Sequence, residues 1–460
     1  MPNGTTVLQA VAPVAGEKTE LALDAIQGLD TLLADDGTEA WVKTDLLRLV
    51  LLADFASQAK TGRESATVQA EMQHAAERLD PWVKERLPNK VQVGSQWVDP
   101  ATLTPVQRCT LYLALLSAES GEKRYGPNQG VDVSQRASGP SSKAKSHDRT
   151  VHVPKSTDDP FGLGTQINAD QHSAGDGYQP PKEAPTGTIS DTITRSNTLQ
   201  NKERIDAETA AVSITRIEHL DGTRSYRVII PGTVDWGSGS PAAQDLLTNL
   251  QGAAGMPTDM ESGVVTAMRM AGIRPEDEVM LYGHSQGGIT AVNIAADPEV
   301  AKDFTITEVL TAGSPTAHAK LPESVHALHL ENGGDAVPAL DGAPTLPGPN
   351  RTIVQLDTHE QETEYPHQAL VYAKVAENLE QAGEPAVDEW SKHHKRLMGV
   401  GEQVTLPGGA VVTATTTEVI YDVRRTVGQN PPPSPSPQLS PSPQSGKGSG
   451  QASGQSSGTG

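Results

Sequence analysis

The chain has 460 residues, of which 36% are hydrophobic and only 3% aromatic, and its formal net charge is −21. This acidity argues against nucleic acid as a partner, because phosphate binding needs clustered Lys and Arg, and it disfavours steady docking on an anionic membrane. The single cysteine, Cys109, excludes an internal disulfide framework and cysteine-based metal sites.

The sequence carries no sign of export or of membrane insertion. Its N-terminus lacks the basic and apolar regions of a secretory signal. The longest apolar run, residues 46–53, is interrupted by Arg48 and is far too short to span a bilayer. We therefore expect a cytoplasmic protein without a transmembrane segment, with export by a route that reads no N-terminal signal as the alternative.

Residues 1–120 are predicted to form a helical region. Apolar residues recur at helical spacing, for example over 68–83. Thr104 followed by Pro105, with Gln107 at the third position, is a good helix start. We find no chemistry in this region and interpret it as a lid or as a module that docks a protein partner.

Residues 121–205 differ in composition from the region before them. They are rich in Ser, Gly, Pro, Asp and Lys, with few large apolar residues and no sustained period. This composition predicts a low-complexity linker or a partly disordered insertion. His147, His152 and His172 lie here without a partner at metal-ligand spacing, and we expect all three to be solvated.

Residues 206–428 are predicted to form an α/β domain. Two strands flank Asp221-Gly222, which is a strong hairpin turn, and short apolar strands then alternate with helices up to about residue 384. An antiparallel start followed by β-α-β units predicts a mostly parallel sheet flanked by helices. The expected strands cover 212–220, 226–230, 279–282, 306–310, 325–330 and 352–356, and the expected helices cover 259–271, 287–296 and 368–380.

The end of the chain divides into two parts. Residues 385–428 predict one more helix, with His393 and His394 on a solvated basic face, and then a hairpin whose second strand covers 411–423. Residues 429–460 consist almost entirely of Pro, Ser, Gly and Gln, and are predicted to be a disordered tail.

One segment carries a motif for nucleophilic catalysis. Gly283-His284-Ser285-Gln286-Gly287 fits the pattern G-x-S-x-G, and it lies between an apolar strand and a helix of small residues. A sharp turn lifts the serine hydroxyl out of the sheet and leaves it at a helix N-terminus, where developing negative charge is stabilised. We predict that Ser285 is the nucleophile of a hydrolase, and that His284 packs against it.

A serine hydroxyl needs a base that is held by an acid, and in this arrangement both follow the nucleophile in the chain. Asp335 lies in a glycine-rich loop directly after a predicted strand, which makes it the favoured acid. Asp341 and Asp357 are its competitors. The alternative role for Asp335 is that of a turn aspartate bonded to its own backbone.

The base is expected on a loop after the last predicted strand. His367, which precedes the helix predicted over 368–380, is favoured over His359. The other downstream histidines are predicted to have no catalytic role. We expect His326 and His329 to be core residues of a strand and His318 to lie in a surface loop.

The oxyanion of a tetrahedral intermediate needs two amide donors. The N–H of Gln286, directly after the nucleophile, is one candidate. The second is the loop after the strand that ends at Ile230, where Gly232 lets the backbone approach the substrate and Thr233 adds a hydroxyl. An ordinary Pro-Gly turn is the alternative for this loop.

Taken together, these motifs resemble the α/β-hydrolase superfamily and, within it, the fungal-type (class 3) lipases. Pro231-Gly-Thr233 is similar to their oxyanion loop, the segment 283–288 to their elbow, and Asn332-Gly-Gly-Asp335-Ala-Val-Pro338 to their acid loop. The resemblance implies Ser285 as nucleophile, Asp335 as acid, a later histidine as base, an acyl-ester substrate and no cofactor.

The expected function is hydrolysis of a small-molecule or lipid ester through an acyl-enzyme. A thioesterase or a peptidase on the same fold is one alternative. The other is a hydrolase-like domain that serves only as a binding or scaffold module.

Overall fold

A mixed sheet of nine strands forms the centre of the part of the chain that the computed structural model describes, residues 42, 65–136, 150–167, 183–184, 186–357 and 366–428. The strand order is β10-β9-β8-β7-β6-β5-β13-β3-β4. Neighbours from β10 to β6 are parallel, and those from β6 to β4 are antiparallel. The strands are β3 (Asn128–Gln135), β4 (Thr150–Pro154), β5 (Ala210–Glu218), β6 (Arg224–Ile230), β7 (Glu278–His284), β8 (Thr305–Ala312), β9 (His326–Asn332), β10 (Arg351–Leu356) and β13 (Thr415–Val427).

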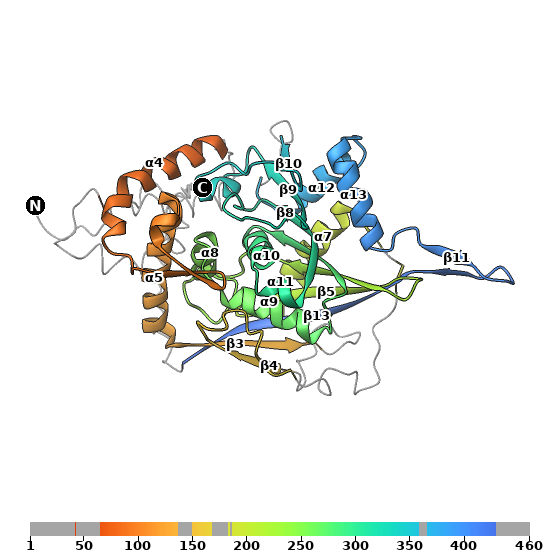
Figure 1. The fold of residues 1–460 in the computed structure, drawn as a ribbon, viewed down its shortest axis with the longest axis horizontal. Coiled ribbons are helices and arrows are strands. Elements are labelled where there is room, and N and C mark those ends of the chain that lie inside the picture. The colour runs from red at the N-terminus through yellow and green to blue at the C-terminus, as the bar shows by residue number, and fades with distance from the viewer. Residues whose placement is uncertain are drawn as a thin grey trace, which may run out of the picture.

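Helices cover both faces of this sheet (Figure 1). On one face, Val264, Val292 and Val300 pack into an apolar core with the strands, and on the other face Ile193 and Trp390 do the same. The first face carries α9 (Asp259–Met270), α10 (Gln286–Ala296) and α11 (Val300–Asp303), and the second carries α7 (Ile189–Lys202), α12 (Ala369–Leu379) and α13 (Pro385–Leu397). The prediction of an α/β domain is thus confirmed as a mixed sheet flanked by helices. The sheet is not mostly parallel, however, because four of its eight neighbouring strand pairs are antiparallel.

The predicted hairpin at the start of this sheet is present. His219 donates its backbone N–H to the carbonyl oxygen of Thr223 at 3.0 Å, and Gly222 takes a positive φ of 87°. The predicted strands and helices between residues 212 and 380 all appear, with boundaries shifted by a few residues. Periodicity was sufficient here because each element buries a regular apolar face.

The N-terminal helices pack against the loops at one end of the sheet. Val68 and Leu79 share an apolar cluster with Leu246 and Val337, which lie on loops and helices next to the sheet. The predicted helix start is confirmed, because the Thr104 side chain accepts the Gln107 N–H and the Gln107 side chain accepts the Thr104 N–H. The elements are α4 (Ser65–Lys84), β1 (Val91–Val93), β2 (Gln96–Val98), η2 (Pro100–Thr102), α5 (Pro105–Tyr125), α8 (Leu246–Ala253) and η3 (Val337–Asp341).

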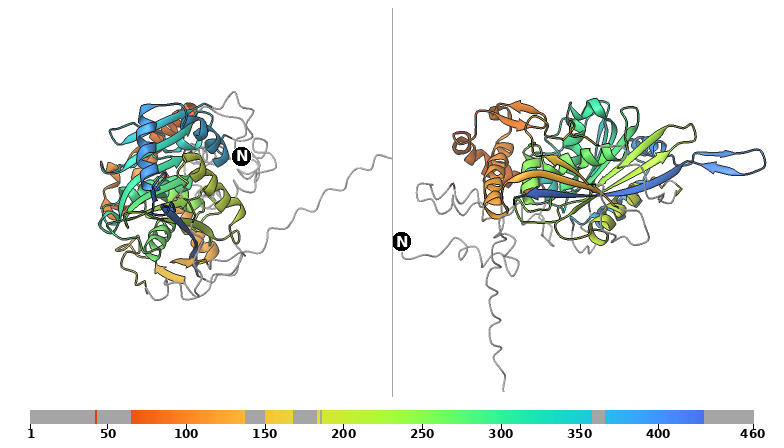
Figure 2. Two further views of the ribbon diagram at one scale, coloured as in Figure 1. Left: turned by 90° about the vertical axis from the view of Figure 1, so that its right-hand side faces the viewer. Right: turned by 90° about the horizontal axis from the view of Figure 1, so that it is seen from below.

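The prediction of a linker over 121–205 is wrong for the parts of it that the structure describes. β3 and β4 extend the central sheet beside β13. α7 covers the face of the sheet that lies opposite α9 (Figure 2). Composition was misleading because these elements bury small sets of residues, such as Val131 and Val133, among polar neighbours. His152 is half exposed and bonds Asp132 at 2.7 Å, whereas His147 and His172 lie outside the described residues.

The strand predicted over 411–423 is divided in the structure. β11 (Gln403–Thr405) and β12 (Val411–Thr413) form a separate hairpin that projects from the body, at the end opposite α4 and α5 (Figure 1). β13 begins at Thr415 and enters the central sheet between β5 and β3. The break depends on partners far away in the sequence, so local pattern could not reveal it. The predicted tail, 429–460, lies outside the described residues.

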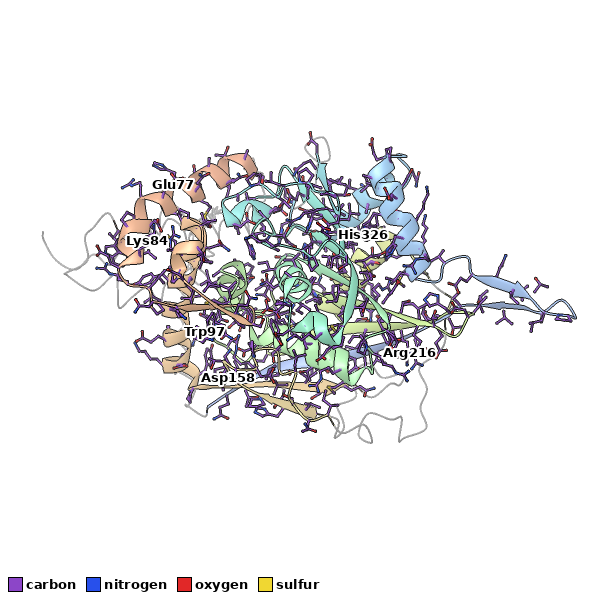
Figure 3. All side chains as sticks on the ribbon, in the orientation of Figure 1. Glu77, Lys84, Trp97, Asp158, Arg216 and His326 are labelled. Carbon is purple, nitrogen blue, oxygen red and sulfur yellow. The ribbon has the colours of Figure 1, made fainter. Side chains whose placement is uncertain are left out.

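The prediction of a solvated face for His393 and His394 is wrong. Both rings bond the carboxylate of Glu308 on β8, which is fully buried, and His394 is only 1% exposed. His326 lies at the start of β9 (Figure 3). Its ring is 5.2 Å from that of His393. Among the described residues, no helix is long and apolar enough to cross a membrane.

Candidate active site

Ser285 occupies the sharp turn between β7 and α10. Its φ of 56° and ψ of −123° make it the one non-glycine residue with a positive φ in the described part of the chain. A Cβ on Gly283 would collide with the backbone of Gly287, and one on Gly287 would collide with the carbonyl of Ile230. Only glycine at these two positions lets strand, turn and helix approach so closely.

His367 connects this serine to an acid. Its Nε2 lies 2.9 Å from the Ser285 Oγ, and its Nδ1 lies 2.7 Å from the Asp335 Oδ2. Asp335 follows β9, and His367 precedes α12, so the ends of three different elements supply the three side chains. Ser285 and His367 are each 8% exposed, and Asp335 is 1% exposed. Hydrogen bonds between such buried side chains are electrostatically stronger than in water.

Asp335 accepts further hydrogen bonds that hold both of its oxygens. The Val337 N–H donates to Oδ1 at 2.9 Å, and the Tyr372 hydroxyl donates to Oδ2 at 2.7 Å. Tyr372 in turn accepts the backbone N–H of Asn332 at 3.2 Å. Burial and the neighbouring Asp335 raise the pKa of Tyr372 well above its usual value, so its hydroxyl remains a donor.

His284 supports the loop that carries His367. Its Nε2 lies 2.8 Å from the backbone carbonyl oxygen of His367, and the two rings are 4.9 Å apart. Burial, and then the proximity of His367, lower the pKa of His284 to about 3. The ring is therefore neutral and donates from Nε2, which fits the packing role expected for it.

The loop predicted to hold the oxyanion lies directly against Ser285. A Cβ built on Gly232 would lie 3.1 Å from the Cβ of Ser285, a closer contact than most side chains make, so a larger residue here would require a small shift of Ser285. The next residue, Thr233, has its hydroxyl oxygen 3.0 Å from the Asn249 Nδ2. Gln286 is the first residue of α10, and its N–H has no acceptor within the helix.

The competitors for these roles lie elsewhere. Asp341 accepts the Ala317 N–H at 2.7 Å, and burial raises its pKa to about 7. Asp357 is exposed at the end of β10, and His359 lies outside the described residues. His329 is a buried core residue, bonded to Thr311 at 2.7 Å.

The two remaining downstream histidines, His326 and His318, lie in different environments. His326 is exposed, so the prediction that it is a core residue is wrong. His318 is partly buried, and its ring bonds Asn293 at 3.3 Å. Within the described residues, no group of His, Cys, Asp and Glu could hold a metal ion.

Sequence reasoning missed the polar residues that support the site. Tyr372 lies on the apolar face of a predicted helix, where nothing distinguishes it from a core aromatic residue. Asn249 and Gln244, which bond the loop of Thr233, lie in a stretch without a motif. These contacts join residues that are not neighbours in the sequence, and so no local signal could have found them.

No protein-family model matches the chain, and no curated protein matches it. Among solved structures, the product of the gene lin2722 from Listeria innocua is similar to 44% of this chain and 91% of its own length, with 13% sequence identity and a TM-score of 0.24. A likeness of this degree supports no statement about function. The chemistry of the site is therefore interpreted from its own geometry.

Proposed function

We propose that this chain is a serine hydrolase of the α/β-hydrolase superfamily that cleaves carboxylic esters. One observation carries the proposal: the hydroxyl of Ser285 lies 2.9 Å from the His367 Nε2, while the opposite nitrogen of that ring lies 2.7 Å from buried Asp335. A nucleophile, a base and an orienting acid in this geometry activate a hydroxyl for acyl transfer.

The reaction has two steps. Ser285 attacks the ester carbonyl while His367 takes its proton at Nε2, and Asp335 holds the ring and stabilises its charged form. The N–H groups of Gln286 and Thr233 stabilise the oxyanion, and His367 then gives its proton to the departing alcohol. Water, activated by the same histidine, releases the acid and restores the serine.

The strain at Ser285 supports a catalytic role over a binding or scaffold role. A non-glycine residue in such a backbone conformation costs on the order of 1–3 kcal/mol and persists where the surrounding structure enforces it. A scaffold has no need of this cost, since glycine at the turn would avoid the strain and serve packing equally well. With this conformation, the Ser285 hydroxyl lies at the N-terminus of α10 and within hydrogen-bond distance of His367.

Labelling by a fluorophosphonate tests the proposal. We expect the intact chain to react and Ser285→Ala to be inert, because only an activated serine attacks the phosphorus of the probe and displaces its fluoride. Ser134→Ala is the matched control and should label like the wild type, because Ser134 lies on β3, next to the edge strand β4 and far from β7 in the strand order. An intact chain that does not react, or a Ser285→Ala variant that still does, would contradict the proposal.

A substrate panel then separates the alternatives within the class. Nitrophenyl esters of graded chain length, thioesters and peptides differ in the leaving group, while the attack on the carbonyl is the same. We expect hydrolysis of esters. If the chain reacts with the probe but cleaves only thioesters or only peptides, Ser285 remains the proposed nucleophile and the proposed substrate class is wrong.

A further inference from the structure

A single side-chain amide connects the two residues proposed to hold the oxyanion. Asn249, on α8, lies between Thr233 and Gln286: its Nδ2 is 3.0 Å from the Thr233 Oγ1, and its Oδ1 is 2.9 Å from the Gln286 Nε2. Neither of these partners is near it in the sequence. The contact exists because α8 packs against the start of α10, directly beside the nucleophile.

The direction of each hydrogen bond follows from one backbone carbonyl. The carbonyl oxygen of Asp245 can only accept, and it lies 2.7 Å from the Gln286 Nε2. This nitrogen therefore donates to Asp245 and also to Asn249, which must present its oxygen to Gln286. The nitrogen of Asn249 consequently faces Thr233 and donates to its hydroxyl oxygen.

The base of this network is anchored in the core. Asp245 is fully buried, its Oδ1 accepts the Thr248 N–H at 3.0 Å, and its Oδ2 lies 2.8 Å from the Arg425 Nη1 on β13. Gln286 is 1% exposed. The oxygen of the Asn249 amide is thus held by the buried side chain of Gln286, which is itself bonded to Asp245. This arrangement of hydrogen bonds is present without a substrate.

A hydroxyl that accepts a hydrogen bond at its oxygen keeps its own hydrogen available. The Thr233 Oγ1 lies 3.2 Å from the Asn249 Oδ1, a longer contact than the 3.0 Å to Nδ2, and that oxygen already accepts from Gln286. An oxyanion is a stronger acceptor than an amide oxygen, because charge shortens and strengthens a hydrogen bond. The hydroxyl hydrogen would therefore turn from Asn249 to the oxyanion as negative charge develops.

We propose that Asn249 is a positioning residue that directs the Thr233 hydroxyl to the oxyanion as a donor additional to the two backbone amides. This inference rests on the proposed ester hydrolysis. It identifies a residue that does not touch the substrate and acts only through Thr233 and Gln286. Its effect should appear in the transition state, where the charge exists, and not in substrate binding.

The test is a double-mutant cycle on p-nitrophenyl butyrate hydrolysis by the full chain, with Asn249→Ala and Thr233→Val. Removing one oxyanion donor lowers kcat by about 100- to 1000-fold, and we expect a reduction of about 10- to 100-fold for Asn249→Ala, with KM nearly unchanged. In the Thr233→Val background, Asn249→Ala should lower kcat by no more than about 3-fold, because the hydroxyl that it directs is absent.

A second measurement separates this role from a structural one. Affinity for a trifluoromethyl ketone, which forms a tetrahedral adduct with an oxyanion, should fall in Asn249→Ala by the same factor as kcat. Asn378→Ala, an exposed asparagine on α12, is the matched control and should leave both quantities unchanged.

The outcomes are distinguishable. Active wild type with an unaffected Asn249→Ala, or additive losses in the double variant, would overturn the inference and leave the proposed function intact. A loss confined to KM would also overturn it. Wild type that neither hydrolyses the ester nor reacts with a fluorophosphonate would overturn the proposed function and this inference together.

Discussion

At the scale of single residues, the site is defined by hydrogen bonds that each have one permitted direction. Asp335 accepts from Val337 at one oxygen and from His367 and Tyr372 at the other, so its carboxylate cannot be replaced by a group that donates. The imidazole of His367 is held in one orientation, with Nε2 toward Ser285. This dependence on direction makes isosteric substitutions the most informative ones.

Asp335→Asn should lower kcat by about 10⁴-fold while the protein remains folded. The new NH₂ group must face either the Val337 N–H, which is also a donor, or His367, where it stabilises the wrong tautomer. Ester hydrolysis measured together with the thermal unfolding midpoint checks this expectation. Asp357→Asn, just after β10, is the control. A larger loss of kcat in this variant than in Asp335→Asn would show that Asp335 is not the acid.

At the scale of elements, the starts of the helices are determined by short-range chemistry. Thr258 caps α9 by accepting the Glu261 N–H at 3.1 Å, and the Glu261 carboxylate accepts the Thr258 N–H at 2.9 Å. In α9 this pair is buried, and Asn293 of α10 donates to the same carboxylate at 2.9 Å. A capping motif that is readable in the sequence has thus become part of the contact between two helices.

Burial at this cap raises the pKa of Glu261 to about 8, so the folded chain holds a proton there that the unfolded chain releases above about pH 4.5. The free energy of unfolding should therefore decrease between pH 4.5 and 8, by up to about 1.4 kcal/mol per pH unit from this residue. Glu261→Gln should remove that slope. Urea unfolding at pH 5.5, 6.5 and 7.5 measures it, with exposed Glu276→Gln as the control; equal slopes for wild type and Glu261→Gln would refute the assignment.

At the scale of the whole molecule, segments from both ends of the chain complete the sheet. β13 lies between β5 and β3, and its fully buried Arg425 bonds Asp245 and Asp259, which lie at the starts of α8 and α9. Arg136, after β3, pairs with Asp422 at 2.6 Å. The region that carries the site is therefore not separable from the residues before it.

A chain reduced to residues 206–428 should fail to unfold cooperatively and should aggregate. It would lack α7, whose Ile189, Ile193 and Leu199 cover one face of the sheet, and β3, which pairs with β13. Such an edge, unpaired and apolar, is a template for association. Thermal unfolding and light scattering measure this; a chain of residues 1–428 is the control. If the chain of residues 206–428 is soluble and unfolds cooperatively, it folds independently of the residues before it, and this prediction is wrong.

The elements and residues that could be predicted are those whose signal is local. The elbow around Ser285, the capping box at Thr104 and the turn at Gly222 each depend on a few neighbouring residues. Asp335 is favoured because it directly follows a predicted strand, and His367 because it precedes a predicted helix; the structure brings both to the same serine.

The alternation of strands and helices and the positions of the reactive side chains follow from local pattern, because periodicity and turn chemistry act over a few residues. The assembly of β3, β4 and β13 into one sheet is a consequence of tertiary packing. So are the hydrogen bond between His394 and Glu308 and the contacts of Asn249 with Thr233 and Gln286. These contacts join residues that are distant in the chain, and their geometry is set by how helices and strands pack.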